Sequence, residues 1–249
     1  MADIKPFCGL RYAENMFTVP PVAPPYDIIP ESMREQLARD KYNIINIDKP
    51  GRPDDAGRYE RAESLLTEWK NIGTLVTDVL DAFYVYRQEY VVPERKNTPR
   101  NMRTGFFAAM KLEEFDKAVV LPHEKTLSAP KVDRMELMKT THANISPIFG
   151  LYHDDSNVVK EMLADIVMQK PIHAIYEDDD KTRHTLWKVS DPDTIEKMVA
   201  ALKSRKVIIA DGHHRYETAL MYRDYLRNQG KEYSEKANYI LTCLVDFSD

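Results

Sequence analysis

Apolar residues recur along the chain with two different periods, which predict a mixture of strands and helices. Spacings of three and four residues, which place apolar side chains on one helix face, occur over residues 30–38, 56–71, 131–140, 158–168, 193–203 and 216–227. Alternation and short apolar runs predict strands over residues 42–47, 81–92, 103–112, 148–152, 172–177, 184–189, 207–210 and 239–245. Because hairpins and helices are interleaved, we expect an α+β (mixed α/β) fold with a mixed sheet and helices.

Proline, glycine and capping residues mark where several of these elements begin and end. Pro30 suits a first helical turn, Asp191 followed by Pro192 predicts a capped helix start, and Gly73 predicts a helix end. The proline-rich residues 6–27 predict an ordered extended loop, because proline excludes both helix interiors and central strands. Polar segments predict a long hairpin connection over residues 93–101 and an acidic turn over residues 178–181.

The domain organisation follows from length and from the end of the chain. The 249 residues contain no internal repeat and fit one large domain or two modest ones. Residues 153–171 offer one internal boundary. The strand predicted over residues 239–245 comes last and needs a partner, so we interpret residues 1–249 as the N-terminal part of one larger domain whose C-terminal part is missing.

The composition is that of a globular protein, and it excludes several functional classes. Hydrophobic residues make up 43% and charged residues 30% of the chain. There is neither a secretory signal pattern nor a run of about 18 apolar residues, so we expect a cytoplasmic protein without a membrane partner. A net charge of -5 argues against a nucleic-acid partner. Cys8 and Cys243 are too far apart for a zinc motif, and we expect both to be reduced and structural.

The segment V-I-I-A-D-G-H-H-R-Y-E-T-A-L, residues 207–220, carries the strongest chemical signal. A buried strand ends at Asp211, Gly212 permits a tight turn, and a helix follows whose first amides are free to bind an anion. His213, His214 and Arg215 add donors that suit a di- or triphosphate, although no Walker or Rossmann glycine spacing is present. In the bland alternative, Asp211 is a helix cap, Arg215 lies at the surface and one histidine is a core residue.

Two further segments carry weaker signals. In L-P-H-E-K-T, residues 121–126, His123 and Glu124 suit a general base and Lys125 suits a phosphate-binding cation, although a solvated loop fits equally well. In V-A-P-P-Y-D, residues 22–27, Asp27 beside Tyr26 suits substrate or metal binding, but a structural role is favoured for the prolines.

Six motifs in one order resemble the bacterial family catalogued as domain of unknown function 1015, over the whole chain. They are K-P-F-C-G-L-R-Y (5–12), V-A-P-P-Y-D (22–27), Y-N-I-I-N (42–46), L-P-H-E-K-T (121–126), A-N-I-S-P-I-F-G-L-Y (143–152) and A-D-G-H-H-R-Y-E-T-A (210–219). The D-G-H-H-R segment alone is also similar to the nucleotide pocket of the ParB/sulfiredoxin-like superfamily, which includes free-serine kinases. That resemblance implies a ParB-like strand-turn-helix at residues 207–220.

The second resemblance also implies roles for single residues. Gly212, His213, His214 and Arg215 would cradle the phosphates of ATP or ADP, and Asp211 would hold Mg²⁺. No motif fixes the acceptor-side base, for which we select Glu124 because it shares a loop with His123 and Lys125.

We therefore expect a nucleotide-dependent phosphotransferase that acts on a small hydroxyl metabolite, in the manner of a free-serine kinase. The alternatives are a non-catalytic nucleotide-binding regulatory module of the ParB type and a ParB-like nuclease, the latter disfavoured by the acidity of the chain. The expected partner is a small molecule. The sequence indicates neither the acceptor nor the oligomeric state.

Overall fold

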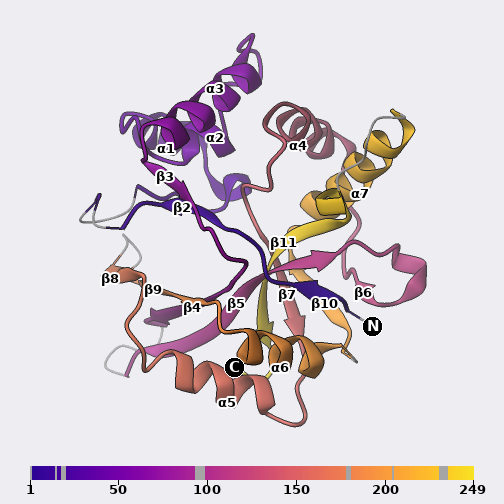
Figure 1. Ribbon diagram of the computed structural model, residues 1–249. Helices are drawn as coiled ribbons and strands as arrows, with labels where there is room; N and C mark the ends of the chain where they lie inside the picture. Colours follow the sequence, from indigo (N-terminus) through magenta and orange to yellow (C-terminus); the bar gives the residue numbers. More distant parts are fainter. Residues whose placement is uncertain are drawn as a thin grey trace.

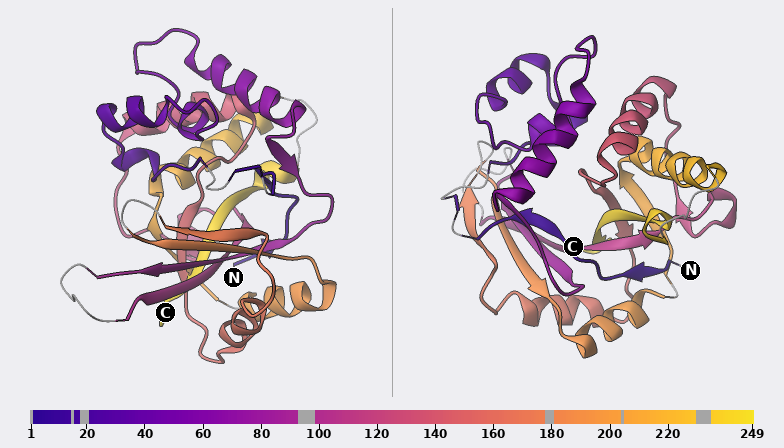
Figure 2. Two further views of the ribbon diagram at one scale, coloured as in Figure 1. Left: turned by 90° about the vertical axis from the view of Figure 1, so that its left-hand side faces the viewer. Right: turned by 45° about the horizontal axis from the view of Figure 1, so that its top comes forward.

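The computed structural model describes residues 2–14, 16–17, 21–92, 99–177, 181–203, 205–229 and 235–249. A large mixed sheet lies at the centre, and helices cover both of its faces (Figures 1 and 2). This arrangement confirms the predicted mixed α/β fold with a mixed sheet.

The central sheet combines parallel and antiparallel pairs. Its strands follow the order β6 (Val120–Leu121), β10 (Val207–Asp211), β7 (Ile148–Tyr152), β11 (Tyr239–Asp246), β5 (Asn101–Lys111), β4 (Phe83–Tyr90), β9 (Arg183–Val189) and β8 (His173–Glu177), and β1 (Ile4–Lys5) adds to β5. The pairs β6–β10 and β7–β11 are parallel, whereas the other neighbours are antiparallel. Strands β2 (Leu10–Tyr12) and β3 (Leu75–Thr77) form a separate small sheet.

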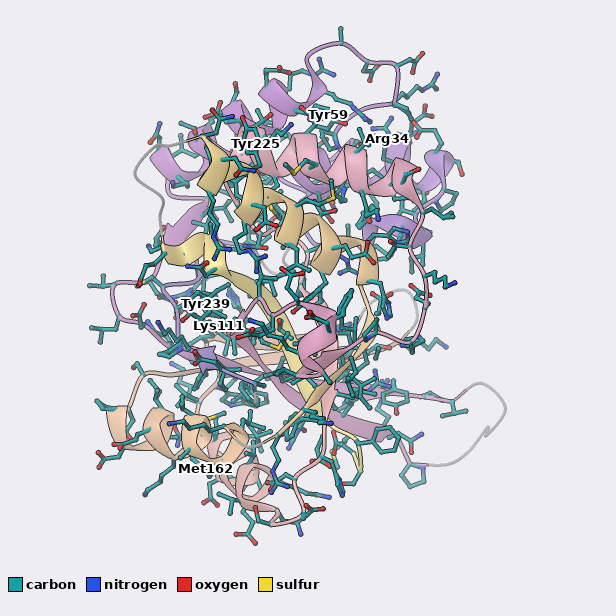
Figure 3. The ribbon with its side chains drawn as sticks, turned by 90° about the vertical axis from the view of Figure 1, so that its right-hand side faces the viewer. Arg34, Tyr59, Lys111, Met162, Tyr225 and Tyr239 are labelled. Atoms are coloured by element: carbon teal, nitrogen blue, oxygen red, sulfur yellow. The ribbon has the colours of Figure 1, made fainter. Side chains whose placement is uncertain are left out.

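The helices divide between the two faces of the sheet. Helices α5 (Val158–Ile166) and α6 (Pro192–Leu202) cover one face, and α4 (Ser128–Thr141) and α7 (His213–Asn228) lie on the other (Figure 1). Helices α1 (Glu31–Leu37), α2 (Ile45–Asp48) and α3 (Arg58–Asn71) extend this second side, and short 3-10 turns occupy Tyr26–Ile28, Phe115–Lys117 and Glu235–Asn238. In Figure 3, Tyr59 of α3 and Tyr225 of α7 lie on one side of the sheet and Met162 of α5 on the other.

Two apolar clusters hold these layers together. The larger one joins the sheet to helices α5, α6 and α7 through fully buried side chains such as Phe106, Met198 and Tyr216. The smaller one joins α2, α3, β3 and α4 around Trp69 and Leu137. Helix α4 therefore belongs to the second cluster while it packs along α7, and this places the start of α7 beside the α2–α3 region.

One predicted strand is wrong. Residues 42–47 were expected to be extended, but a helical turn, α2, begins at Ile45. Asn43 accepts a hydrogen bond from the Ile45 amide at 3.0 Å, and the Asn46 side chain donates to the carbonyls of Asp40 and Asn43 at 2.9 and 3.2 Å. Asparagine side chains that bond the local backbone in this way stabilise a turn, which here overrides the β propensity of the isoleucines.

The other predicted helices and strands agree with the structure, with some changes at their ends. Strands β1, β2, β3 and β6 were not predicted, and β2 lies within residues 6–27, which were expected to form an extended loop. Gly73 has a φ of 77°, and Asp191 accepts a hydrogen bond from the Thr194 amide at 2.9 Å, so the predicted helix end and cap are confirmed. Helix α4 begins at Ser128, before Pro130, and α7 begins at His213 rather than at residue 216. Strand β11 is paired on both sides, by β5 and β7, so the expectation that it lacks a partner is wrong. Residues 93–98 and 178–180 of the predicted hairpin connection and acidic turn lie outside the described residues.

Candidate functional site

Three of the segments selected from the sequence meet at a cleft of about 1190 Å³ beside the start of α7. Residues 211–215 form one wall of this cleft, Glu124 comes from the loop after β6, and Tyr26 and Asp27 come from the proline-rich segment. Residues 49–54, Arg58, Tyr59 and part of α4 complete the lining. The parallel pairing of β6 with β10 explains why the first two segments meet, because both strands end at the same edge of the sheet.

Gly212 makes the turn between β10 and α7. Its φ of 91° belongs to the left-handed region, and a Cβ at this position would lie 3.0 Å from both the Arg215 Nε and the Ile148 Cγ2 atoms. No other residue type fits both restrictions without strain. The turn brings helix α7 directly off the end of the strand.

The first turn of α7 presents unsatisfied donors. Gly212 has no side chain to cap the helix, and within the described part of the chain the amides of His213, His214 and Arg215 donate to no acceptor. The partial positive charge of a 16-residue helix adds to these donors. The start of α7 therefore has the geometry of an anion-binding site.

The loop between β6 and α4 is bound to this helix start by its backbone. The His123 amide donates to Nε2 of His213 at 3.2 Å, and the Leu127 amide donates to Nε2 of His214 at 3.0 Å. Nδ1 of His123 donates to the carbonyl of Ile209 in β10 at 2.6 Å. Each of the three histidines is thus held in one orientation by a backbone group.

A side-chain cluster fixes the far end of the same loop. The Thr126 hydroxyl donates to the Glu217 carboxylate at 2.6 Å, and Lys131 Nζ lies 2.7 Å from the same oxygen. Burial alone would raise the pKa of Glu217, but the hydrogen bonds from Lys131 and Thr126 outweigh it and lower that pKa. Glu217 therefore ties the loop to α7 as a carboxylate.

His213 and Glu124 face each other at the centre of the site. The His213 side chain is 1% exposed, and its Nδ1 lies 3.0 Å from Oε1 of Glu124. The two atoms are not aligned for a hydrogen bond, so Nδ1 has no hydrogen-bond partner among the described residues. Burial lowers the pKa of His213, and the nearby Glu124 carboxylate offsets only part of this effect.

Arg215 is buried in the wall of the cleft. Its guanidinium donates to the Pro147 carbonyl and to the Asp211 carboxylate, and Asp27 lies 3.8 Å away. Only Nε lacks a hydrogen-bond partner among the described residues. At 8% exposure, Arg215 is not the surface residue of the bland alternative, and two of its nitrogens are already engaged.

Tyr26 joins the proline-rich segment to the same site. Its buried ring packs against two cations, with the Cζ of Arg134 4.0 Å and the Cζ of Arg215 5.8 Å from its centroid. Arg134 in turn donates to the Asp48 carbonyl at 2.7 Å and lies 3.2 Å from its carboxylate. A cation–π layer therefore closes the cleft beneath Asp27.

Comparison with known proteins identifies the family but not an activity. A family model described as a protein of unknown function, DUF1015, matches residues 4–249. The chain belongs to the DUF1015 family. None of the curated proteins and none of the solved structures matches it. No helix among the residues that the structure describes is both long and apolar enough to span a bilayer.

Motif segments of this DUF1015 protein that lie far apart in the chain converge on the cleft. Tyr26 comes from V-A-P-P-Y-D, Glu124 from L-P-H-E-K-T, the carbonyl of Pro147 from A-N-I-S-P-I-F-G-L-Y, and Arg215 from A-D-G-H-H-R-Y-E-T-A. The first, second and fourth of these were assigned candidate chemistry from the sequence, whereas the third was not. The structure therefore makes one site out of four separate motifs.

The predicted site residues of this DUF1015 protein do not all lie in the cleft. Glu124, Asp211, Gly212, His213, His214 and Arg215 line it. Lys125 is exposed and is not one of the described residues that line it, and His123 lies behind Glu124 in contact with His213. Of the Asp211 carboxylate, Oδ2 is engaged by Arg215 and only Oδ1 is left for a cation.

Sequence reasoning missed two carboxylates that organise the site. Glu217 lies four residues after His213, one helical turn along α7, so helical spacing was a signal that could have found it. Asp48 is the last residue of α2, where it accepts a hydrogen bond from Ser146 at 2.5 Å and pairs with Arg134. No local pattern marks Asp48, because its partners lie about a hundred residues away.

Proposed function

We propose that this DUF1015 protein is a nucleotide-dependent phosphotransferase that acts on a small hydroxyl metabolite, comparable to a free-serine kinase. The observation that carries the proposal is the wall of donors at the start of α7. Among the described residues, three amides, the buried Nδ1 of His213 and the buried Nε of Arg215 have no acceptor, and the residues that carry them line one cleft. Donors without acceptors are costly to bury, and phosphate oxygens would satisfy them.

The dimensions and lining of the cleft support a ligand larger than phosphate. A volume of about 1190 Å³ accommodates a nucleotide together with a small acceptor. Pro50, Pro53, Tyr59, Pro130 and Val132 give the cleft an apolar side. We assign this side to the base or sugar and the α7 start to the phosphates.

The acceptor hydroxyl would be activated by Glu124. Its carboxylate is 51% exposed and stands next to the donor wall, where an acceptor oxygen would approach a bound phosphoryl group. His123 donates its Nδ1 proton to Ile209, so a neutral ring carries its lone pair on Nε2 and can receive a proton behind Glu124. In this proposal Glu124 removes the hydroxyl proton, and the acceptor oxygen forms a bond to the terminal phosphorus of the nucleotide. The bridging P–O bond breaks, the nucleotide leaves with one phosphate fewer, and the donor wall stabilises the charge on the transferred phosphoryl group.

Mg²⁺ fits the carboxylates of the cleft. Asp27 and Asp211 are 39% and 53% exposed, both lie beside Arg215, and they offer the oxygen ligands that this ion prefers. Asp211 would contribute Oδ1, because Oδ2 is bound to Arg215. When bound, the ion would spread the negative charge of the nucleotide phosphates.

The alternative is a nucleotide-binding regulatory module that consumes its nucleotide slowly, as proposed from the resemblance of D-G-H-H-R to the ParB/sulfiredoxin-like superfamily. The same donor wall would serve it, so geometry at α7 does not separate the two functions. The carboxylate of Glu124 beside the wall favours catalysis.

A ParB-like nuclease is disfavoured by six acidic side chains around the cleft, namely Asp27, Glu31, Asp54, Glu124, Asp133 and Asp211. A small-molecule enzyme of this kind fits the cytoplasmic location expected from the sequence.

The proposal is tested by incubating the purified chain with ATP or ADP, Mg²⁺ and a mixture of hydroxyl amino acids that includes serine. We expect mass spectrometry to detect a phosphorylated amino acid. Glu124→Gln should abolish the product and keep nucleotide binding. The control His153→Ala changes an exposed histidine beyond the opposite end of β7 and should keep both. Tight nucleotide binding without product would favour the regulatory module, and absence of nucleotide binding would overturn both readings.

A further inference from the structure

Two backbone amides determine where the protons of the site histidines lie. The amides of His123 and Leu127 point at Nε2 of His213 and His214, at 3.2 and 3.0 Å. An amide hydrogen can only be accepted by a nitrogen that keeps its lone pair. A neutral imidazole whose Nε2 accepts must carry its proton on Nδ1.

We propose that the loop after β6 holds His213 and His214 as uncharged Nδ1–H tautomers, and that both donate a hydrogen bond to the phosphoryl group of the ligand. The identity of this ligand rests on the proposed function. The tautomers themselves rest only on the two backbone contacts. His213 and His214 both line the cleft and are the first two residues of α7.

The proposed Nδ1–H donor of His213 has no acceptor among the described residues. Its Nδ1 is buried and has no hydrogen-bond partner among the described residues, although Oε1 of Glu124 lies 3.0 Å away out of alignment. Glu124 belongs to an exposed loop position, so its side chain can move aside when an anionic oxygen approaches. A buried donor aimed into a cleft is a strong indication of a ligand acceptor.

Neutral donors suit this position better than imidazolium ions. The groups that face His213 are Glu124 and His123 from the loop and Asp211 and His214 from its own segment. Protonation would place a hydrogen on Nε2, which could then no longer accept the His123 amide, whereas the neutral tautomer keeps this contact and still offers Nδ1–H as a donor. The two rings therefore extend the row of α7 amides as uncharged dipoles.

The same tautomer excludes a metal ion at the most obvious cluster. Among the described residues, ligand atoms of His123, Glu124 and His213 lie within 4.8 Å of one another, a spacing that would suit a transition metal. Nδ1 of His213 would have to offer a lone pair to such an ion. With Nε2 accepting from the His123 amide, Nδ1 carries a hydrogen instead.

The tautomers can be measured directly on the full chain by long-range ¹H–¹⁵N NMR with ¹⁵N-labelled histidine. At neutral pH we expect His213 and His214 to show a protonated Nδ1 and an unprotonated Nε2. Adding inorganic phosphate or ADP should shift Nδ1 of both rings. An Nε2–H tautomer or an imidazolium at either residue would overturn the proposal, as would Zn²⁺ binding through Nδ1 of His213.

Paired amide substitutions give a second readout. His213→Asn keeps a donor near the position of Nδ1, whereas His213→Gln places its amide near Nε2. We expect His213→Gln to weaken ADP binding by about 10-fold or more and His213→Asn to weaken it clearly less, since one hydrogen bond to an anion contributes about a factor of 10. Equal losses would overturn the donor role. A phosphate response at Nδ1 without any phosphorylated product would leave the donor role intact and count against the proposed catalysis alone.

Discussion

The His123 amide donates a hydrogen bond to Nε2 of His213, and the two rings meet edge to face with their centroids 4.5 Å apart. The contact joins residues 90 positions apart in the chain. It links the loop after β6 to the first turn of α7, and so it turns two separate motifs into one wall of the cleft. The predictions below test what this wall is made of and what it binds.

Gly212 should be intolerant of any side chain. Gly212→Ala would force a residue with a Cβ atom into the left-handed backbone region and place that Cβ 3.0 Å from Arg215 Nε. We therefore expect a loss of about 2 kcal/mol in unfolding free energy. Gly73→Ala is the matched control, because Gly73 also has a positive φ but a Cβ there meets nothing within 4 Å. Urea unfolding of both variants checks the difference. Equal losses would show that strain alone matters and that the Arg215 contact is unimportant.

Arg215→Ala should destabilise the protein even without ligand. The substitution leaves the Pro147 carbonyl and the Asp211 carboxylate without their donor, at a cost of about 2 kcal/mol. Arg227→Ala, on the same helix but 50% exposed, should cost less than about 1 kcal/mol. Thermal unfolding of both variants, with and without ADP, separates the two roles. An unchanged melting temperature for Arg215→Ala would mean that the guanidinium is free, as the sequence alone suggested.

Glu217→Gln should loosen the loop that orients the two histidines. The change removes a carboxylate that binds both Thr126 and Lys131. We expect the loss of these contacts to cost about 1 kcal/mol of local stability. We therefore expect the amides of His123 and Leu127 to exchange with solvent about 5-fold faster. Hydrogen exchange measured by NMR checks this. Glu136→Gln, which affects only the half-exposed pair with Lys139 on α4, is the control and should leave these amides unchanged.

The ionisation of Asp78, a residue remote from the cleft, should make the unfolding free energy depend on pH in the acid range. Burial alone would raise its pKa, but hydrogen bonds from Arg11, Tyr84 and Lys188 lower it to about 2 from an ordinary value of 3.8. A depressed folded-state pKa stabilises the protein above pH 3.8, and this contribution disappears as the pH falls towards 2. It amounts to about 2 kcal/mol at neutral pH.

Asp78→Asn tests this network. The variant should lose about 2 kcal/mol relative to the wild type at pH 7. The difference should shrink as the pH falls below 4, because the carboxylate of the unfolded wild type takes up a proton there while the folded one stays ionised until about pH 2. Denaturant unfolding at several pH values measures it. A difference that stays constant from pH 7 to pH 3 would contradict the assigned pKa shift.

Local patterns were enough to predict most elements and the shape of the turn at Gly212. The apolar run of β10, the glycine and the donors that follow it all lie within ten residues, so the sequence displays them together. The α2 region was missed because its structure depends on asparagine side chains that bond the backbone, a preference that outweighs the alternation of apolar residues.

Contacts across the chain could not be predicted in the same way. His123 reaches His213 only because β6 pairs in parallel with β10, with Val120 opposite Val207, and no local pattern encodes that pairing. The engagement of Arg215 by Pro147 likewise depends on β7 lying next to β10. The sequence therefore selected Lys125 and His123, which do not line the cleft, together with residues that do, and it treated Arg215 as a free donor.

An ADP titration followed by ¹H–¹⁵N amide spectra of the full chain tests whether the start of α7 binds the phosphates of a nucleotide. We expect saturable shifts that are largest for the amides of His213, His214 and Arg215. Absence of shifts at millimolar ADP, or shifts that are largest away from these three amides, would contradict it.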